Sequence, residues 1–73
     1  MAQNVENEFL KIIGERIRKS RKQVGISQEQ LADLASLDRT YIGGIERGER
    51  NITILNLKKV ADAIGIPLKD IVG

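Results

Sequence analysis

The side chains able to do chemistry in this chain are arginines, lysines, carboxylates and amides, because its 73 residues include no histidine and no cysteine. Histidine is the commonest general base and metal ligand, and a cysteine thiolate is needed for a disulfide, a thiol nucleophile or a sulfur-ligated zinc site. The run "GGIERGER" over residues 43–50 has neither the spacing nor the lysine of a phosphate-binding loop. We therefore expect that the protein is not an enzyme and has no catalytic residue, cofactor or metal site.

Basic residues are concentrated in one segment of the chain. Residues 11–22 hold six basic side chains against one acidic side chain, whereas residues 26–38 hold three acidic side chains and no basic one. The net charge is only +2, so the distribution is more informative than the total. Such an asymmetry suggests a surface that faces a polyanion, although a solvated helix face produces the same pattern.

A second candidate binding segment is the run "SLDRTYIGGIERGER", residues 36–50. It combines the hydrogen-bonding side chains of "RTY" with two adjacent glycines, Gly43 and Gly44. Each interior glycine destabilises a helix by about 1 kcal/mol relative to alanine. Because glycine lets a backbone come close to a ligand, the pair indicates a helix face made for close approach.

Five helical segments are predicted to position these residues within one domain, 1–73. Apolar periodicity predicts a first helix from Glu8 to about Gln23, with Asn7 as its cap and a flexible arm over residues 1–6 before it. Further helices are predicted over about 27–36, 39–47 and 53–64, with a short last one ending at Val72. No apolar run is long enough for a membrane span or reads as a signal peptide, so we expect a cytoplasmic protein with no membrane partner.

The second and third predicted helices are joined by only about three residues, which is typical of a helix-turn-helix unit over about 27–47. A generic helical bundle has the same elements, and the spacing of residue types favours the helix-turn-helix. Ala32 is small where the two helices must cross, Ile42 and Ile45 supply an inner apolar face, and "RTY" supplies an outward polar one.

The segment "SQEQLADLASLDRTYIGGIERGER" resembles the Xre/Cro family of phage-repressor type, and the resemblance covers about residues 9–72. The blocks "DRTYI" and "GIERGERN" are similar to the controller proteins of restriction–modification systems. The resemblance implies an all-α, compact five-helix DNA-binding domain that regulates transcription by binding pseudo-palindromic operator DNA as a homodimer, with RNA polymerase as a further candidate partner. A phage Cro-like repressor, an antitoxin and a protein-interaction adaptor of the same fold are the alternatives.

The family pattern also implies roles for single residues of the third helix. Arg39 and Thr40 match its base-reading start, where an arginine bridges guanine O6 and N7 and a threonine methyl meets a thymine methyl. Gly43 and Gly44 would then bring the helix backbone close to the groove floor. The alternative for Arg39 is a surface ion pair with Asp38 or Glu46.

Other residues are expected on the DNA backbone. Gln28 resembles a position that clamps a phosphate at a helix N-terminus, where free N–H groups favour anions; otherwise it is an exposed first-turn residue. Tyr41 either bonds a phosphate or packs at the helix edge. The remaining expected phosphate contacts are Arg47, Arg50 and Asn51, with Arg16 and Arg18 as weaker candidates.

Two further sets of residues are expected to stabilise the fold or the dimer rather than to contact DNA. In the family an arginine of the first helix pairs with a glutamate near the end of the third, which implies a structural ion pair between Arg21 and Glu46. The C-terminal helices hold more apolar residues than one small core needs, and a self-complementary patch among them would form a dimer interface. The residues expected there are Ile52, Ile54, Leu55, Ile66, Leu68 and Ile71.

Overall fold

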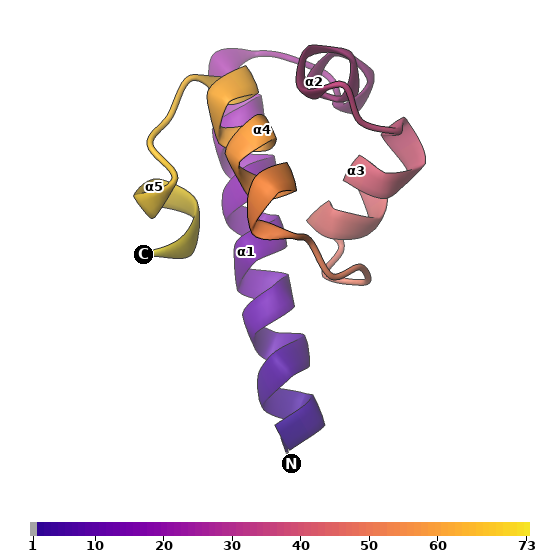
Figure 1. Cartoon of the computed structure of the whole chain (residues 1–73), viewed down its shortest axis with the longest axis vertical. Helices are drawn as coiled ribbons and strands as arrows, with labels where there is room; N and C mark the ends of the chain where they lie inside the picture. The colour runs from indigo at the N-terminus through magenta and orange to yellow at the C-terminus, as the bar shows by residue number, and fades with distance from the viewer. Residues whose placement is uncertain (1) are drawn as a thin grey trace.

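The structure of the protein is a computed structural model that describes residues 2–73, with side chains from residue 6 onward. The described part contains five α-helices and no strand: α1 Ala2–Val24, α2 Gln28–Ala35, α3 Arg39–Glu46, α4 Ile54–Ile64 and α5 Lys69–Val72. In Figure 1, α1 and α4 lie side by side, α2 and α3 lie to one side of them, and α5 lies to the other. The predicted all-α architecture is confirmed.

The first helix begins earlier than the sequence pattern predicted. It is already helical at Ala2, so the flexible arm expected over residues 1–6 and the cap expected at Asn7 are wrong for residues 2–7. Met1 lies outside the described residues. No glycine or proline occurs between residues 2 and 13, and adding residues to an existing helix has little cost once a nucleus has formed.

The next two helices begin at the predicted caps. The Ser27 hydroxyl accepts a hydrogen bond from the Gln30 backbone N–H at 3.0 Å, and the Gln30 side chain accepts one from the Ser27 N–H at 2.8 Å. Asp38 accepts from the Thr40 N–H at 2.7 Å. Such caps contribute about 1 kcal/mol each, and they fix where α2 and α3 start.

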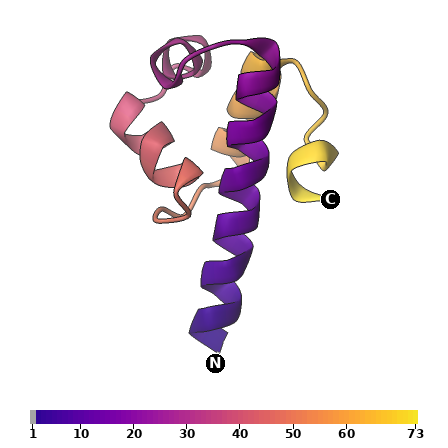
Figure 2. The same cartoon turned by 180° about the vertical axis from the view of Figure 1, so that it is seen from behind.

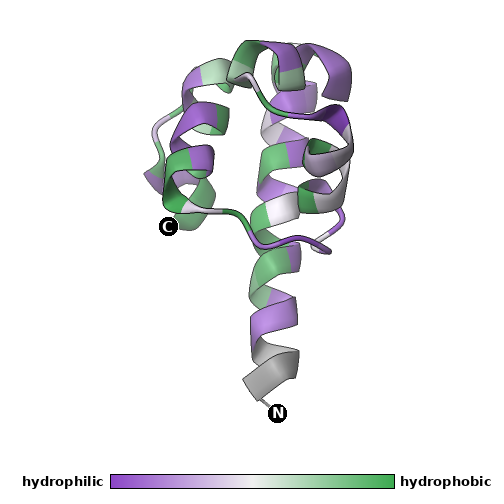
Figure 3. Cartoon of the chain, turned by 45° about the vertical axis from the view of Figure 1, so that its right-hand side comes forward, coloured by the Kyte–Doolittle hydropathy of each residue, from purple (hydrophilic) through white to green (hydrophobic). Residues whose placement is uncertain are grey.

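The core is formed by side chains from all five helices. The largest fully buried ones are Ile17, Leu31, Ile42, Ile45, Val60 and Ile71. Figure 3 shows hydrophobic residues where the helices face one another and hydrophilic residues on much of the outer surface. Within the described chain, none of the helices combines the length and apolar character that crossing a membrane requires.

The end of α3 packs directly on the backbone of α1. A Cβ atom added to Gly14 would lie 2.3 Å from the Ile45 carbonyl oxygen and 2.7 Å from that of Glu46. A Cβ on Gly48, which has a φ of +74°, would lie 2.9 Å from the Lys11 Cα. Both glycines therefore permit a close approach that no larger residue allows, and they hold the end of α3 against α1.

Candidate nucleic-acid interface

The α2–α3 unit has the geometry of a helix-turn-helix. Ser36 ends α2 in the left-handed conformation, with a φ of +56°, and the Leu37 N–H donates to the Ala32 carbonyl at 2.9 Å. Ala32, Ile42 and Ile45 are buried, as the spacing predicted. The view from behind in Figure 2 shows α2 and α3 joined by this short turn, with α3 beside α1.

The N-terminal end of α3 presents its first two side chains to solvent. Arg39 and Thr40 are both exposed, and the Asp38 carboxylate is occupied as the helix cap. Among the described residues Arg39 forms no ion pair, and Glu46 is bound elsewhere. The structure thus gives no support to the alternative in which Arg39 pairs with Asp38 or Glu46.

The buried ion pair implied by the resemblance is present. Arg21 Nε and Nη2 donate to the two Glu46 carboxylate oxygens at 2.7 and 3.0 Å, and both residues are less than one-tenth exposed. The third guanidinium nitrogen, Nη1, donates to the Ile26 carbonyl at 2.9 Å. The hydrogen bonds to Glu46 raise the pKa of Arg21 and outweigh the opposing effect of burial. The pair ties α1, the start of the α2 segment and α3 together.

Gln28 belongs to the same network. Its side-chain Nε2 donates to Glu46 Oε1 at 2.9 Å, and the residue is half-buried. The simple alternative of an exposed first-turn side chain is therefore wrong. In this structure the side chain positions α2 against α3.

Gly43 and Gly44 are buried, not open to the surface. A Cβ on Gly43 would lie 3.1 Å from Arg47 Nη1, and one on Gly44 would lie 2.5 Å from Arg50 Cγ. The missing side chains therefore make room for two arginine side chains that fold back along α3. The prediction that Gly43 and Gly44 leave an open helix face is wrong for the unbound protein. The glycine backbone becomes accessible only if these arginine side chains move.

Tyr41 makes contacts within the protein. Its hydroxyl donates to the Asn51 carbonyl at 3.3 Å and accepts from Asn56 Nδ2 at 3.1 Å. The Arg50 guanidinium carbon lies 5.3 Å from the centre of its ring, within cation–π range. Of the two predicted roles, packing at the helix edge is the one observed, and the ring links α3 to the following loop and to α4.

The other expected phosphate contacts differ in their surroundings. Arg47, Arg50 and Asn51 are exposed, and Arg47 Nε is 3.0 Å from Glu49 Oε1. Arg16 Nη1 donates to the Ile71 carbonyl at 2.9 Å, which gives it a structural role between α1 and α5. Arg18 lies 3.9 Å from Glu15 on the exposed side of α1.

The residues expected at a dimer interface divide into three groups. Ile54 and Leu55 are 62% and 72% exposed, and Ile52, Ile66 and Leu68 are half-buried. Ile71 is fully buried in the core, so its assignment to an interface was wrong. Its side chain belongs to the hydrophobic core instead.

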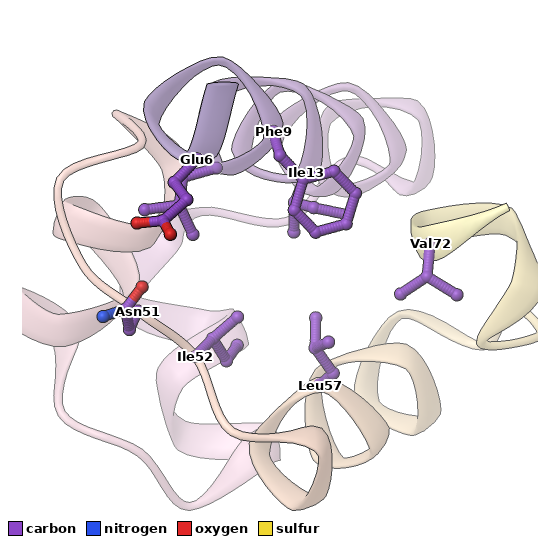
Figure 4. Close-up of a pocket in the computed structure, with 8 residues that line it drawn as sticks. Glu6, Phe9, Ile13, Asn51, Ile52, Leu57 and Val72 are labelled. Atoms are coloured by element: carbon purple, nitrogen blue, oxygen red, sulfur yellow. The ribbon is translucent and has the colours of Figure 1, made fainter. Parts of the chain in front are cut away.

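An apolar hollow next to Ile52 was not predicted. Phe9, Ile13, Leu57 and Val72 line it with Ile52, and Figure 4 shows their side chains pointing into it from α1, the loop before α4, α4 and α5. Phe9 is 54% exposed and therefore available to a partner. The signal in the sequence was the apolar stripe of the first helix, which was used only to predict that helix.

Three features of the site were missed because they depend on tertiary packing. A single glycine inside a helical pattern often marks a packing contact, which was the only sign of Gly14. Asn56 and Glu49 carried no sign at all, since their partners are Tyr41 and Arg47. No group of three or more potential metal ligands occurs in the described residues.

The chain is similar to known proteins over most of its length. Helix-turn-helix is the family that matches residues 17–71. Control protein C.BamHI of Bacillus amyloliquefaciens is 39% identical over 66 residues, which are 89% of this chain and 82% of that protein. The structure of the restriction–modification controller protein C.AhdI from Aeromonas hydrophila superposes with a TM-score of 0.84 and 45% identity, covering 85% of this chain and 94% of that one.

A third similarity is to a protein seen on DNA. The structure of C.Esp1396I bound to a 19 base pair DNA duplex matches with a TM-score of 0.78 and 41% identity, covering 81% of this chain and 79% of that one. These relatives are regulators rather than enzymes. The chain belongs to the helix-turn-helix family of DNA-binding transcription regulators, in the group that contains the restriction–modification control proteins.

Proposed function

We propose that this protein binds a pseudo-palindromic operator as a homodimer and thereby controls the expression of restriction–modification genes. The observation that carries the proposal is the start of α3: two exposed side chains, Arg39 and Thr40, follow the Asp38 cap, and a buried ion pair fixes the other end of the same helix against α1. A recognition helix reads base edges with its N-terminal residues, and an arginine there discriminates guanine.

The residues around this helix end supply the contacts that set register on the duplex. Arg47, Arg50 and Asn51 are exposed in the segment that follows α3, and α2 begins at the exposed Ser27 cap. Contacts with phosphates position a protein on DNA without reading its sequence. Gly43 and Gly44 contribute to this arrangement because their missing side chains leave room for the side chains of Arg47 and Arg50 along α3.

A homodimer fits the exposed apolar surface. One short recognition helix reads only a few base pairs, and a two-fold dimer reads half-sites about 34 Å apart. Ile54 and Leu55 are exposed at the start of α4, and the hollow that Phe9 lines is close to Ile52. We assign the interface to this surface and to the half-buried Ile66 and Leu68. RNA polymerase is a further candidate partner of such a regulator, and the cytoplasm is its proposed place of action.

Selection of duplexes from a random pool tests the proposal. The expected product is a two-fold symmetric sequence whose half-site centres are one helical turn apart, bound with a steep loss of affinity as salt rises, because bound phosphates release counterions. An adaptor that uses the same fold to bind proteins gives weak, salt-insensitive binding and no enriched sequence. That second outcome would overturn the proposal.

A further inference from the structure

A polar hollow lies between α1 and the loop that follows α3, outside the helix-turn-helix itself. Two basic side chains face it from different elements, Lys11 from α1 and Arg47 from the end of α3. The polar residues that line it are Glu6, Asn7, Lys11, Arg47, Glu49 and Asn51. The hollow thus brings residues of α1 beside the loop whose arginines are proposed to contact DNA.

The position of Lys11 follows from the packing at Gly48. The backbone of Gly48 lies so close to Lys11 that an added Cβ would be 2.7 Å from its Cγ and 3.0 Å from its backbone nitrogen. This contact fixes the stem of Lys11 at the corner where α3 ends. Lys11 is exposed, and among the described residues it forms no ion pair, so its ammonium group is available to an anion.

Arg47 already binds an anion in the unbound protein. Its Nε lies 3.0 Å from the Glu49 carboxylate, and both side chains are more than half exposed. A guanidinium pairs with a carboxylate or a phosphate through the same planar set of donors. An exposed pair of this kind is weak, so a DNA phosphate can replace the carboxylate.

We propose that this hollow is a binding site for a backbone phosphate of duplex DNA, formed by Lys11 and Arg47, and that Glu49 holds Arg47 until the phosphate displaces it. The proposal rests on the proposed function, because the anion is that of the bound duplex. It adds a residue of α1 to the interface and makes Glu49 a residue that weakens binding. Glu6 also lines the hollow and adds a second negative charge that the phosphate must oppose.

The test of Lys11 is the salt dependence of binding by Lys11→Gln, with Lys69→Gln as a matched control. Lys69 lies on α5, on the opposite side of α1 and α4 from α3 (Figure 1). Affinity is measured for the duplex selected from a random pool and for a scrambled duplex of the same length. Loss of one phosphate contact reduces the slope of log K against log salt by about 1, which corresponds to roughly eightfold weaker binding at about 0.1 M salt.

The expected result is that Lys11→Gln weakens binding to both duplexes by this factor and lowers the slope, whereas Lys69→Gln matches the wild type. Thermal unfolding of both variants should coincide with that of the wild type. An unchanged slope in Lys11→Gln overturns the proposal. If the wild type itself shows neither salt dependence nor preference for the selected duplex, the proposed function fails, which is a different result.

The test of Glu49 is a double-mutant cycle with Arg47. Glu49→Gln should tighten binding about two- to fivefold, since an exposed ion pair of this strength no longer has to be broken. In an Arg47→Gln background the same substitution should have a markedly smaller effect. An equal gain in both backgrounds would show that Glu49 acts only as a nearby negative charge, and it would overturn the displacement of Glu49 by phosphate.

Discussion

Alanine substitutions at two helical glycines should have opposite effects on stability. At Gly14 the added methyl group meets backbone atoms of α3, at 2.3 Å from the Ile45 carbonyl oxygen and 2.9 Å from the Glu46 carbonyl carbon. At Gly43 it meets only side-chain ends, at 3.1 Å from Arg47 Nη1 and in ordinary contact with Gln28 Oε1 at 3.6 Å. The same substitution therefore meets rigid backbone atoms at Gly14 and flexible side-chain atoms at Gly43.

The magnitudes follow from two opposing terms. Either alanine gains about 1 kcal/mol of helix propensity. At Gly43 little opposes this gain, so Gly43→Ala should stabilise the fold by up to about 1 kcal/mol. At Gly14 relief of the contact requires α1 and α3 to separate, and overpacking of this kind has a typical cost of 1–3 kcal/mol or more. Separation would also strain the Arg21–Glu46 pair, so Gly14→Ala should destabilise by about 2 kcal/mol after the propensity gain is counted.

Thermal unfolding followed by circular dichroism measures both variants. For a domain of this size each 1 kcal/mol shifts the midpoint by about 4–8 °C, so the two variants should differ by roughly 10 °C or more. Protein concentration must be the same in all samples, because a dimer has a concentration-dependent midpoint. A Gly14→Ala variant as stable as the wild type, or a Gly43→Ala variant that loses as much stability as Gly14→Ala, would contradict this difference between the two sites.

Three further outcomes are expected. Glu46→Ala should destabilise the fold by about 3–5 kcal/mol in denaturant titrations, because it leaves a buried guanidinium unpaired; a loss below about 1 kcal/mol, typical of an exposed pair, would contradict this assignment. Leu55→Glu should shift the monomer–dimer equilibrium toward monomer in sedimentation experiments while leaving the helical content unchanged, and an unaltered equilibrium would remove Leu55 from the interface. Gly44→Glu should abolish operator binding in titrations, since its carboxylate displaces Arg50 and faces the phosphates. The stability of the fold should change little, because the gain in helix propensity is offset by the loss of the Arg50 side chain's packing. Full retention of binding would contradict this.

The helical elements were largely predictable because their signals are local. Ser27 and Asp38 are caps whose partners lie two or three residues away, and apolar residues at helical spacing fill the core as predicted. The start of α1 was not predictable in this way. Its first turns contain neither a helix breaker nor a strong apolar pattern, and their state depends on continuation from a helix already formed.

The exposure of the first residues of α3 was predictable from the sequence, whereas the positions of the arginines near its end were not. Arg39 and Thr40 are exposed as expected because the helix cap and the buried face of α3 leave them no other direction. The positions of Arg47 and Arg50 over the two glycines depend on Glu49 and Tyr41, which contact them through the fold. Nothing in residue types or spacing distinguishes a glycine that admits DNA from one that admits an arginine side chain.

The proposed function depends on base reading in the major groove by the exposed start of α3. The most direct measurement is the base preference of Arg39→Ala, obtained by titrating the selected duplex and all its single-base variants against this protein and the wild type. Binding of Arg39→Ala to the selected duplex should weaken by about 1–3 kcal/mol, and the preference should be relaxed at one guanine in each half-site, with other positions unchanged. Equal weakening at every position, or an unchanged preference at all of them, would contradict it.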